Sequence, residues 1–237
     1  MNPAGLASAP AGRAWTASID PLRASAAMIL ILGAALCGLS LPTAGGAAAS
    51  SVKIALAELA GSSAAFVWLR RSAGVKRGWD LVSAAPLRLR DLRIVAAAPP
   101  LIWIGCAVLG WCWGGVLEKL GIPFEKEQTL IALVPRVSTA EFLLLVLAVG
   151  VITPVAEEFF FRRLLYGLLE PTGRLRATLA TAAIFSAAHG FLYGLPGFFW
   201  MGIVFQFVYC RCRNLIAPAA VHLIVNCVAL VATRAGI

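Results

Sequence analysis

The chain has 237 residues, of which 60% are hydrophobic and 13% are charged, and its mean hydropathy is +0.87. These values lie far outside the range of soluble globular proteins. The formal net charge of +9 comes from Lys and Arg placed between apolar stretches, as in the cytoplasmic loops of membrane proteins, and no nucleic-acid-binding motif accompanies it. The composition therefore predicts a multi-pass protein of the cell membrane with no nucleic-acid partner, and the Ala, Gly and Arg content is typical of a bacterial protein.

The N-terminal half is predicted to hold a tail and several spans. Residues 1–23 are rich in Ala, Gly, Pro and Ser and lack apolar periodicity, which predicts a disordered cytoplasmic tail. Residues 24–138 are expected to form N-terminal transmembrane helices joined by a basic cytoplasmic loop, with Glu58 alone in the second span and interpreted as structural. The spans are expected at about 24–41, 51–69 and 94–116, and the basic loop at 70–93.

The C-terminal part, 139–237, is predicted to be a catalytic transmembrane core. One helix over 139–169 would be ~46 Å long at 1.5 Å per residue, which exceeds a hydrocarbon core of ~30 Å. A kink or break is therefore expected between Gly150 and Pro154. Further spans are expected at about 177–193, 198–210 and 215–232, with basic turns at 170–176 and 211–213 between them.

The positions of the basic residues predict the topology. With seven spans and an internal N-terminus, fifteen of the 20 Lys and Arg residues fall in cytoplasmic segments or in the inner half of the helix that carries the glutamates. The predicted fold class is all-α: a polytopic transmembrane helix bundle of about seven spans, with the N-terminus in the cytoplasm and the C-terminus outside.

Two adjacent carboxylates and an arginine interrupt the apolar stretch after Pro154. An ionised group at membrane depth costs at least ~2.5–3.5 kcal/mol on insertion scales, so such groups mark functional sites. Glu158 and Arg162 are four residues apart, which places them on one helical face at ion-pairing distance. Glu157 points ~100° away from that face. The spacing predicts a supporting Glu158–Arg162 ion pair and a second carboxylate, Glu157, without a local partner.

Both histidines of the chain lie in predicted spans downstream of the glutamates. His222 and Asn226 share a helical face, and counting residues from the basic turns brings them, His189 and Glu157 to a similar depth. These residue types suit hydrolysis of an acyl bond by water. Glu157 would act as general base on a water shared with His189, while His222 and Asn226 would donate hydrogen bonds to the oxyanion.

Two other interpretations of these polar residues stay open. They are also typical of interhelical polar contacts in membrane bundles. Glu157, His189 and His222 are plausible zinc ligands as well, and two histidines on separate helices lack a spacing that would decide for or against a metal. The six cysteines contain no CxxC pair and are interpreted as buried free thiols. No HExxH, GxSxG or GxGD motif is present.

Three motifs on successive apolar stretches resemble the CPBP family of intramembrane proteases, which includes type II CAAX prenyl endopeptidases and relatives of lysostaphin resistance and bacteriocin self-immunity proteins. The resemblance covers about 143–231. It implies a glutamate-dependent endopeptidase with a membrane-embedded cavity, in which Glu157, His189, His222 and Asn226 are catalytic and Glu158 and Arg162 hold the helix. The motifs are Glu157-Glu158-x-x-x-Arg162, Phe185-x-x-x-His189 and His222-x-x-x-Asn226.

One departure concerns Arg163, because members of the family usually have glycine there. A wider opening or a snorkelling Arg163 side chain is expected as a result. The function predicted is an intramembrane endopeptidase acting on a membrane-associated or CAAX-like peptide or protein. The alternatives are a catalytically silent scaffold or bacteriocin-immunity protein of the same fold, and a transporter that uses Glu and His as a relay, although no internal repeat supports a transporter.

Overall fold

The computed structural model describes residues 87–237, together with isolated positions between Lys53 and Arg71. Every regular element in this described part is helical. The predicted tail at 1–23, the first span, Glu58 and most of the basic loop lie outside the described residues. The elements are α4 Leu89–Lys119, α5 Thr129–Leu133, α6 Thr139–Leu145, α7 Thr153–Glu158, α8 Tyr166–Leu169, α9 Arg174–Ala188, α10 Leu195–Cys212 and α11 Ile216–Ala235, with π-helical segments at Val146–Ile152 and Phe159–Leu165 and 3₁₀ turns at Val134–Arg136 and Glu170–Thr172.

Four helical stretches within the described residues are long and apolar enough to cross a membrane. The predicted span at 177–193 needs correction. Its helix, α9, has 15 residues and is therefore only ~22 Å long, which is shorter than a hydrocarbon core of ~30 Å. The four candidate spans are Leu89–Lys119, Thr139–Thr172, Leu195–Cys212 and Ile216–Ala235.

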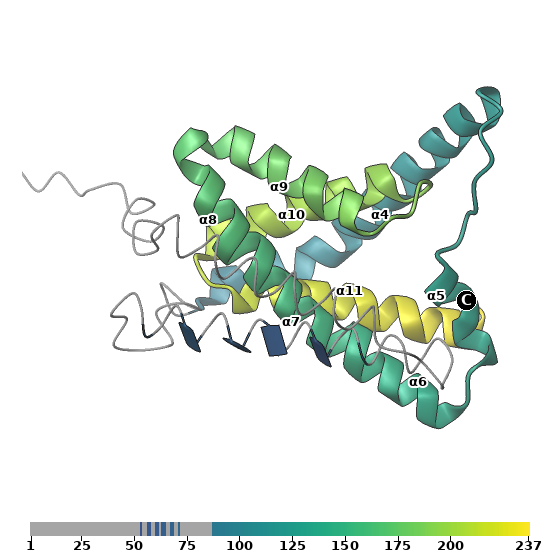
Figure 1. The fold of residues 1–237 in the computed structure, drawn as a ribbon, viewed down its shortest axis with the longest axis horizontal. Helices are drawn as coiled ribbons and strands as arrows, with labels where there is room; N and C mark the ends of the chain where they lie inside the picture. The colour runs from purple at the N-terminus through teal and green to yellow at the C-terminus, as the bar shows by residue number, and fades with distance from the viewer. Residues whose placement is uncertain are drawn as a thin grey trace, which may run out of the picture.

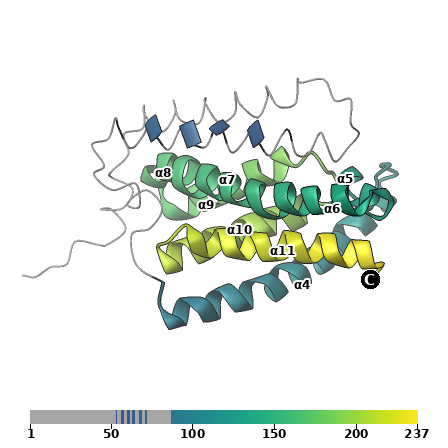
Figure 2. The same cartoon turned by 90° about the horizontal axis from the view of Figure 1, so that it is seen from below.

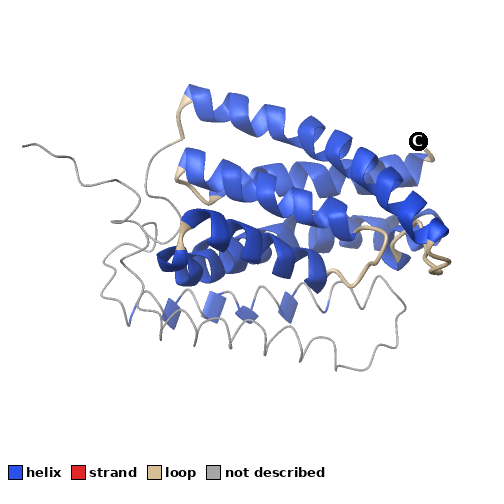
Figure 3. Cartoon of the chain, turned by 90° about the horizontal axis from the view of Figure 1, so that it is seen from above, coloured by secondary structure: helices blue, strands red, loops and turns tan. Residues whose placement is uncertain are grey.

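The helices lie side by side, with the connections gathered at the two ends of the bundle (Figure 3). α11 runs between α4 and the long helix Thr139–Thr172, as Figure 2 shows, and contacts both. α10 packs between α4 and α9 at close range. A Cβ atom on Gly202 of α10 would lie 2.9 Å from the backbone of Ala182 in α9, so this contact requires glycine.

The helix that carries the glutamates does not break. The stretch Thr139–Thr172 is one helix, and the distortion expected between Gly150 and Pro154 takes the form of a π-helical segment. The backbone N–H of Thr153 bonds to the carbonyl of Ala148, five residues earlier. A widened turn accommodates the proline, which has no N–H to donate and would crowd a regular turn. A second π segment follows at once, so α7, with both glutamates, lies between two irregular turns.

The distribution of apolar side chains is that of a membrane protein. Large hydrophobic residues such as Ile104, Trp111 and Leu143 are 65%, 79% and 62% exposed on the outside of the bundle. The interior, by contrast, encloses charged residues: Glu158 and Arg162 are fully buried, and His222 is 2% exposed. The apolar exterior faces lipid, and the ionisable groups face the middle of the bundle, as expected for a multi-pass membrane protein.

Candidate active site

The centre of the site is an ion pair within one helix. Arg162 Nε donates to Glu158 Oε2 at 2.8 Å, and both side chains are completely buried. The pair forms because the two residues are one turn apart on the long helix, as the sequence predicts. A charged hydrogen bond in a dry interior is strong, and removal of either partner would leave an uncompensated charge.

His222 of α11 connects this pair to the second glutamate. Its Nδ1 lies 3.1 Å from Glu158 Oε1, and its Nε2 lies 3.9 Å from Glu157 Oε2. Glu158 and His222 are 64 residues apart in the chain, so the packing of α11 against α7 creates this contact. The result is one chain of polar groups that runs from Arg162 through Glu158 and His222 to Glu157. The partner of Glu157 thus comes from another helix, at the similar depth that the sequence predicts.

The neighbours of His222 assign its two ring nitrogens. The Glu158 carboxylate, which already pairs with Arg162, can only accept, so Nδ1 of His222 carries the hydrogen and donates it. In the neutral ring Nε2 then has the lone pair and faces the Glu157 carboxylate across 3.9 Å. Two acceptors at that separation favour a shared proton or a water that donates to both. The Glu157 side chain is 20% exposed, but its Oε2 atom, which faces His222, is buried.

An aromatic shell, formed by Phe161, Phe185 and Phe205, surrounds the buried guanidinium. The Arg162 Cζ atom lies 5.9, 5.5 and 5.7 Å from the three ring centroids. Its two terminal nitrogens have no hydrogen-bond acceptor among the described residues. Ring faces thus stabilise the part of the guanidinium charge that Glu158 does not reach. Phe205 also stacks on the His222 ring, with centroids 4.6 Å apart.

His189 reaches the site from α9. It caps the C-terminus of that helix, and its Nδ1 lies 2.8 Å from the carbonyl of Phe185. Because a carbonyl only accepts, Nδ1 carries the hydrogen and the neutral ring presents its lone pair at Nε2. The ring stacks on Phe198 at 3.9 Å. Phe185 contacts both histidines, with its centroid 4.6 Å from His189 and 6.0 Å from His222.

Asn226 lies one turn after His222 on α11 and faces the same long helix. Its Nδ2 donates to the carbonyl of Val149 at 3.0 Å, within the first π segment. One of its two amide hydrogens is used in this bond, and the second remains to donate elsewhere. The π segment thereby exposes a carbonyl that orients the Asn226 amide beside the histidine.

Arg163 does not snorkel. It is 2% exposed and hydrogen-bonds the Tyr209 hydroxyl of α10 from inside the bundle. The expectation of a snorkelling side chain was therefore wrong, because a tyrosine on the neighbouring helix offers an internal partner. Phe198 and Phe205, which hold the two histidines, were missed by the sequence reasoning. Their stretch is apolar throughout, and no periodicity distinguishes them from lipid-facing positions.

The residues considered as zinc ligands, if a metal binds, are Glu157, His189 and His222. No group of three or more His, Cys, Asp or Glu residues in the described part of the chain is arranged to hold a metal ion. Nδ1 of His222 is occupied by Glu158, so Nε2, which faces Glu157, is the nitrogen that would be available to a metal ion. The ring of His189 uses Nδ1 for a backbone carbonyl.

Comparisons with known proteins match the part of the chain that contains this site. Residues 139–228 match a family model described as Type II CAAX prenyl endopeptidase Rce1-like, a range that contains the polar chain, His189 and Asn226. Two curated relatives match this chain over less than half of their own length. No solved structure gives a significant match.

The first relative is the "Putative membrane peptidase YdiL" of Bacillus subtilis (strain 168). It is 29% identical over 108 residues, which are 45% of this chain and 42% of the relative. The second is the "Membrane-embedded CAAX protease MroQ" of Staphylococcus aureus (strain USA300), 29% identical over 85 residues, which are 33% of this chain and 34% of the relative.

The apolar helices and these matches define a multi-pass membrane protein with a protease-like segment. Residues 139–228 are thus similar to Rce1-like CAAX proteases, which confirms the resemblance to the CPBP family.

Proposed function

We propose that the protein is an intramembrane endopeptidase that hydrolyses a peptide bond of a membrane-associated or CAAX-like protein. In this proposal 139–237 is the catalytic core, and the partners are the lipid bilayer and the peptide substrate. The observation that carries the proposal is the contact of one histidine, His222, with two carboxylates at 3.1 and 3.9 Å inside an apolar bundle. Burying this many ionisable groups inside a membrane bundle costs free energy, so their presence indicates a functional site.

Glu157 is the general base of the proposed reaction. A water held near Glu157 Oε2 and the lone-pair nitrogen of His189 gives its proton to the carboxylate as its oxygen attacks the scissile carbonyl carbon. His189 orients the water, and Phe198 holds the imidazole by stacking. The apolar surroundings strengthen these charge interactions compared with bulk water.

His222 and Asn226 stabilise the oxyanion that forms on the carbonyl oxygen. Asn226 donates its second amide hydrogen, and Nε2 of His222 donates when the ring carries two protons. Glu158 accepts from the other nitrogen of that ring and is itself balanced by Arg162, so the oxyanion balances the charge of the doubly protonated ring. When the tetrahedral intermediate collapses, protonated Glu157 gives its proton to the leaving amine. No step of this scheme uses a metal.

The proposed topology has about seven spans, of which the short helix α9 is counted as one. The proposed orientation has the N-terminus in the cytoplasm. The described ends of the bundle support it, because arginines gather where α4 and α9 begin, while the opposite end has balanced charge. Single cysteines introduced at Arg211 and at Lys126, in a variant without native cysteines, test the orientation. A membrane-impermeant thiol reagent should label position 126 in intact cells and position 211 only in inverted vesicles.

The activity test compares the reconstituted wild type with Glu157→Gln and with Glu118→Gln, a matched change on an exposed residue at the end of α4. The substrates are a prenylated reporter and a library of membrane peptides, each with and without a chelator. Cleavage by wild type and Glu118→Gln, lost in Glu157→Gln, is the expected result. Loss of cleavage on chelation in the wild type would favour zinc catalysis instead.

Cleavage that persists in Glu157→Gln would contradict the proposed base. If none of the three proteins cleaves, the cellular phenotype of a deletion strain decides. Complementation by Glu157→Gln equal to wild type would favour the silent scaffold or immunity protein.

A further inference from the structure

Arginines from three separate elements gather at one end of the bundle. α4 begins there, α9 begins there and α10 ends there, on the left of Figure 1. The Cys212 thiol at the end of α10 lies within electrostatic range of Asp91 and Arg90, in the first turn of α4, and of Arg211. The ring of Tyr166, at the start of α8, lies 6.3 Å from the ring of Tyr209 on α10. This contact places α8, just before the start of α9, next to the last part of α10. The basic end comprises six exposed arginines: Arg88, Arg90, Arg93, Arg174, Arg176 and Arg211.

Few carboxylates oppose this charge, and they already have partners. Asp91 lies 3.5 Å from Arg90 and accepts the backbone N–H of Arg88 at 2.8 Å. Glu170 lies 3.8 Å from Arg174. Among the described residues of the basic end, the six exposed arginines and the half-buried Arg213 thus face two carboxylates, which leaves an excess of positive charge after all the ion pairs have formed.

At the starts of α4 and α9 the helix dipoles add to this excess, whereas the C-terminus of α10 at the same end carries partial negative charge. α4 and α9 both present their N-termini at the basic end, and an N-terminus carries partial positive charge. α9 has no acidic residue in its first turn and no side-chain cap, since its N-cap is Gly173. Arg174 and Arg176 occupy that first turn, where cations are disfavoured. An external anion is needed to balance both the arginines and the helix ends.

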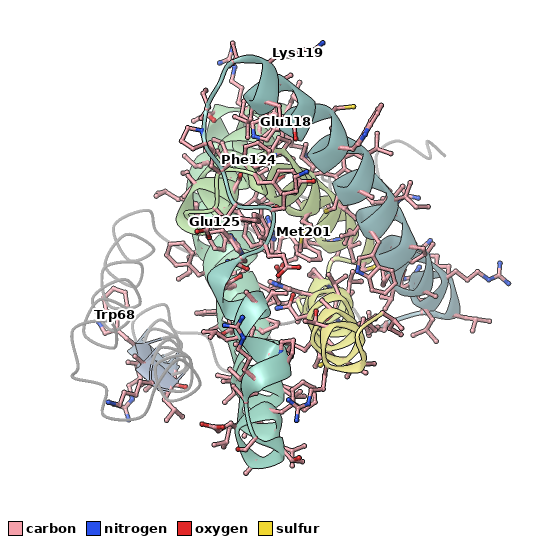
Figure 4. The ribbon with its side chains drawn as sticks, turned by 90° about the vertical axis from the view of Figure 1, so that its right-hand side faces the viewer. Trp68, Glu118, Lys119, Phe124, Glu125 and Met201 are labelled. Carbon is pink, nitrogen blue, oxygen red and sulfur yellow. The ribbon has the colours of Figure 1, made fainter. Side chains whose placement is uncertain are left out.

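The opposite end of the bundle shows that the excess is local. Figure 4 views that end, with Glu118, Lys119 and Glu125 labelled. Lys126 pairs with Glu118 at 3.5 Å there. This balanced end carries four basic and four acidic residues: Lys119, Lys126, Arg136, Arg234, Glu118, Glu125, Glu127 and Glu141.

We propose that the basic end binds the headgroups of anionic phospholipids. A guanidinium matches a phosphate through two parallel N–H donors, and it is weakly hydrated, so it exchanges water for phosphate readily. Three elements of the bundle supply the arginines at this end, and the apolar outer faces of α4 and α9 continue from it along the acyl chains. An anionic phospholipid can pair its phosphate with the arginines and pack its acyl chains on the apolar helix faces, whereas free phosphate can only pair with the arginines. The proposal depends on the membrane location and not on the proposed protease activity.

Two triple variants of the full-length protein test the proposal. The basic-end variant carries Arg93→Gln, Arg176→Gln and Arg211→Gln, and the control carries Lys119→Gln, Lys126→Gln and Arg136→Gln at the balanced end. None of the three arginines in the first variant forms an ion pair recorded for the described residues. Both remove three positive charges, so they change the net charge equally. Binding of fluorescent phosphatidylglycerol is measured in neutral detergent, with phosphatidylcholine and inorganic phosphate as competitors.

The wild type and the control should bind phosphatidylglycerol alike, and the basic-end variant should bind it about 100-fold more weakly at low salt, or roughly fivefold for each arginine. Phosphatidylcholine should not compete. Melting in neutral detergent controls for folding, and the basic-end variant should melt at or above the wild-type temperature because repulsion is reduced. If that variant does not fold, the single changes replace it.

Three results would overturn the proposal. Equal weakening in both triple variants would mean a nonspecific effect of net charge. Competition by phosphatidylcholine would mean attraction to any lipid. Displacement by millimolar inorganic phosphate would mean a site for a free anion.

Discussion

The protein places arginine in two opposite environments, and they differ in what the charge does. Arg162 is fully buried, holds one carboxylate at 2.8 Å and is enclosed by three aromatic rings. Arg174, at the basic end, has a side chain that is 71% exposed and lies 3.8 Å from its carboxylate. Both pairs have the same i, i+4 spacing. Water screens the exposed Glu170–Arg174 pair but not the buried Glu158–Arg162 pair. Two pairs with the same spacing in sequence therefore contribute differently to stability.

Removal of the buried arginine should have the largest effect. Arg162→Ala leaves Glu158 buried without its cation, and we expect a loss of about 3–5 kcal/mol in the free energy of unfolding, with loss of activity. Thermal melting in detergent measures it. The double variant Glu158→Leu/Arg162→Met removes both charges and should melt higher than Arg162→Ala while remaining inactive. A melting temperature of Arg162→Ala equal to that of the wild type would show that the buried ion pair contributes no more to stability than an exposed one.

Glu157→Gln separates catalysis from stability within the buried cluster. Glutamine keeps the size of the side chain but cannot take a proton, so cleavage should fall by about 10²–10⁴-fold, the usual contribution of a general base. The melting temperature should stay close to that of the wild type because Glu157 is partly exposed and lies outside the ion pair. A parallel loss of folding would show that both glutamates have the same structural role.

The aromatic shell can be weakened without touching a charge. Phe205→Leu removes the ring that stacks on His222 and one face around Arg162, and should cost about 1–3 kcal/mol. Phe207→Leu is the matched control, since Phe207 lies two positions away on α10 and is 55% exposed. We expect that control to change stability by less than about 0.5 kcal/mol. If Phe205→Leu and Phe207→Leu lowered the melting temperature equally, the ring of Phe205 would contribute no specific interaction with His222 or Arg162.

The exposed pair should give the smallest effect. Arg174→Ala removes the partner of Glu170 at the start of α9, and we expect a change of at most about 0.5 kcal/mol, because screening limits the pair and the helix N-terminus disfavours the cation. Melting at low and at high salt checks this. A loss comparable with that of Arg162→Ala would remove the distinction between the two environments.

Local features of the sequence predicted much of the fold. Hydropathy predicted helices at 94–116, 198–210 and 215–232, and the structure extends each of them by a few residues into polar flanks. It failed at α9, because an apolar run continues past the residue where the helix ends. His189 caps that end, and Gly190 follows with φ of 59°, a backbone conformation that hydropathy does not encode.

The Glu158–Arg162 pair was determined by the sequence alone, because one helical turn brings the two side chains together whatever surrounds them. The bridge from Glu158 through His222 to Glu157 was decided only by tertiary structure. It joins residues 64 positions apart, and the packing of α11 on α7 sets which nitrogen meets which carboxylate. The aromatic shell has the same origin: Phe161, Phe185 and Phe205 come from three elements, and only their packing turns them toward one guanidinium.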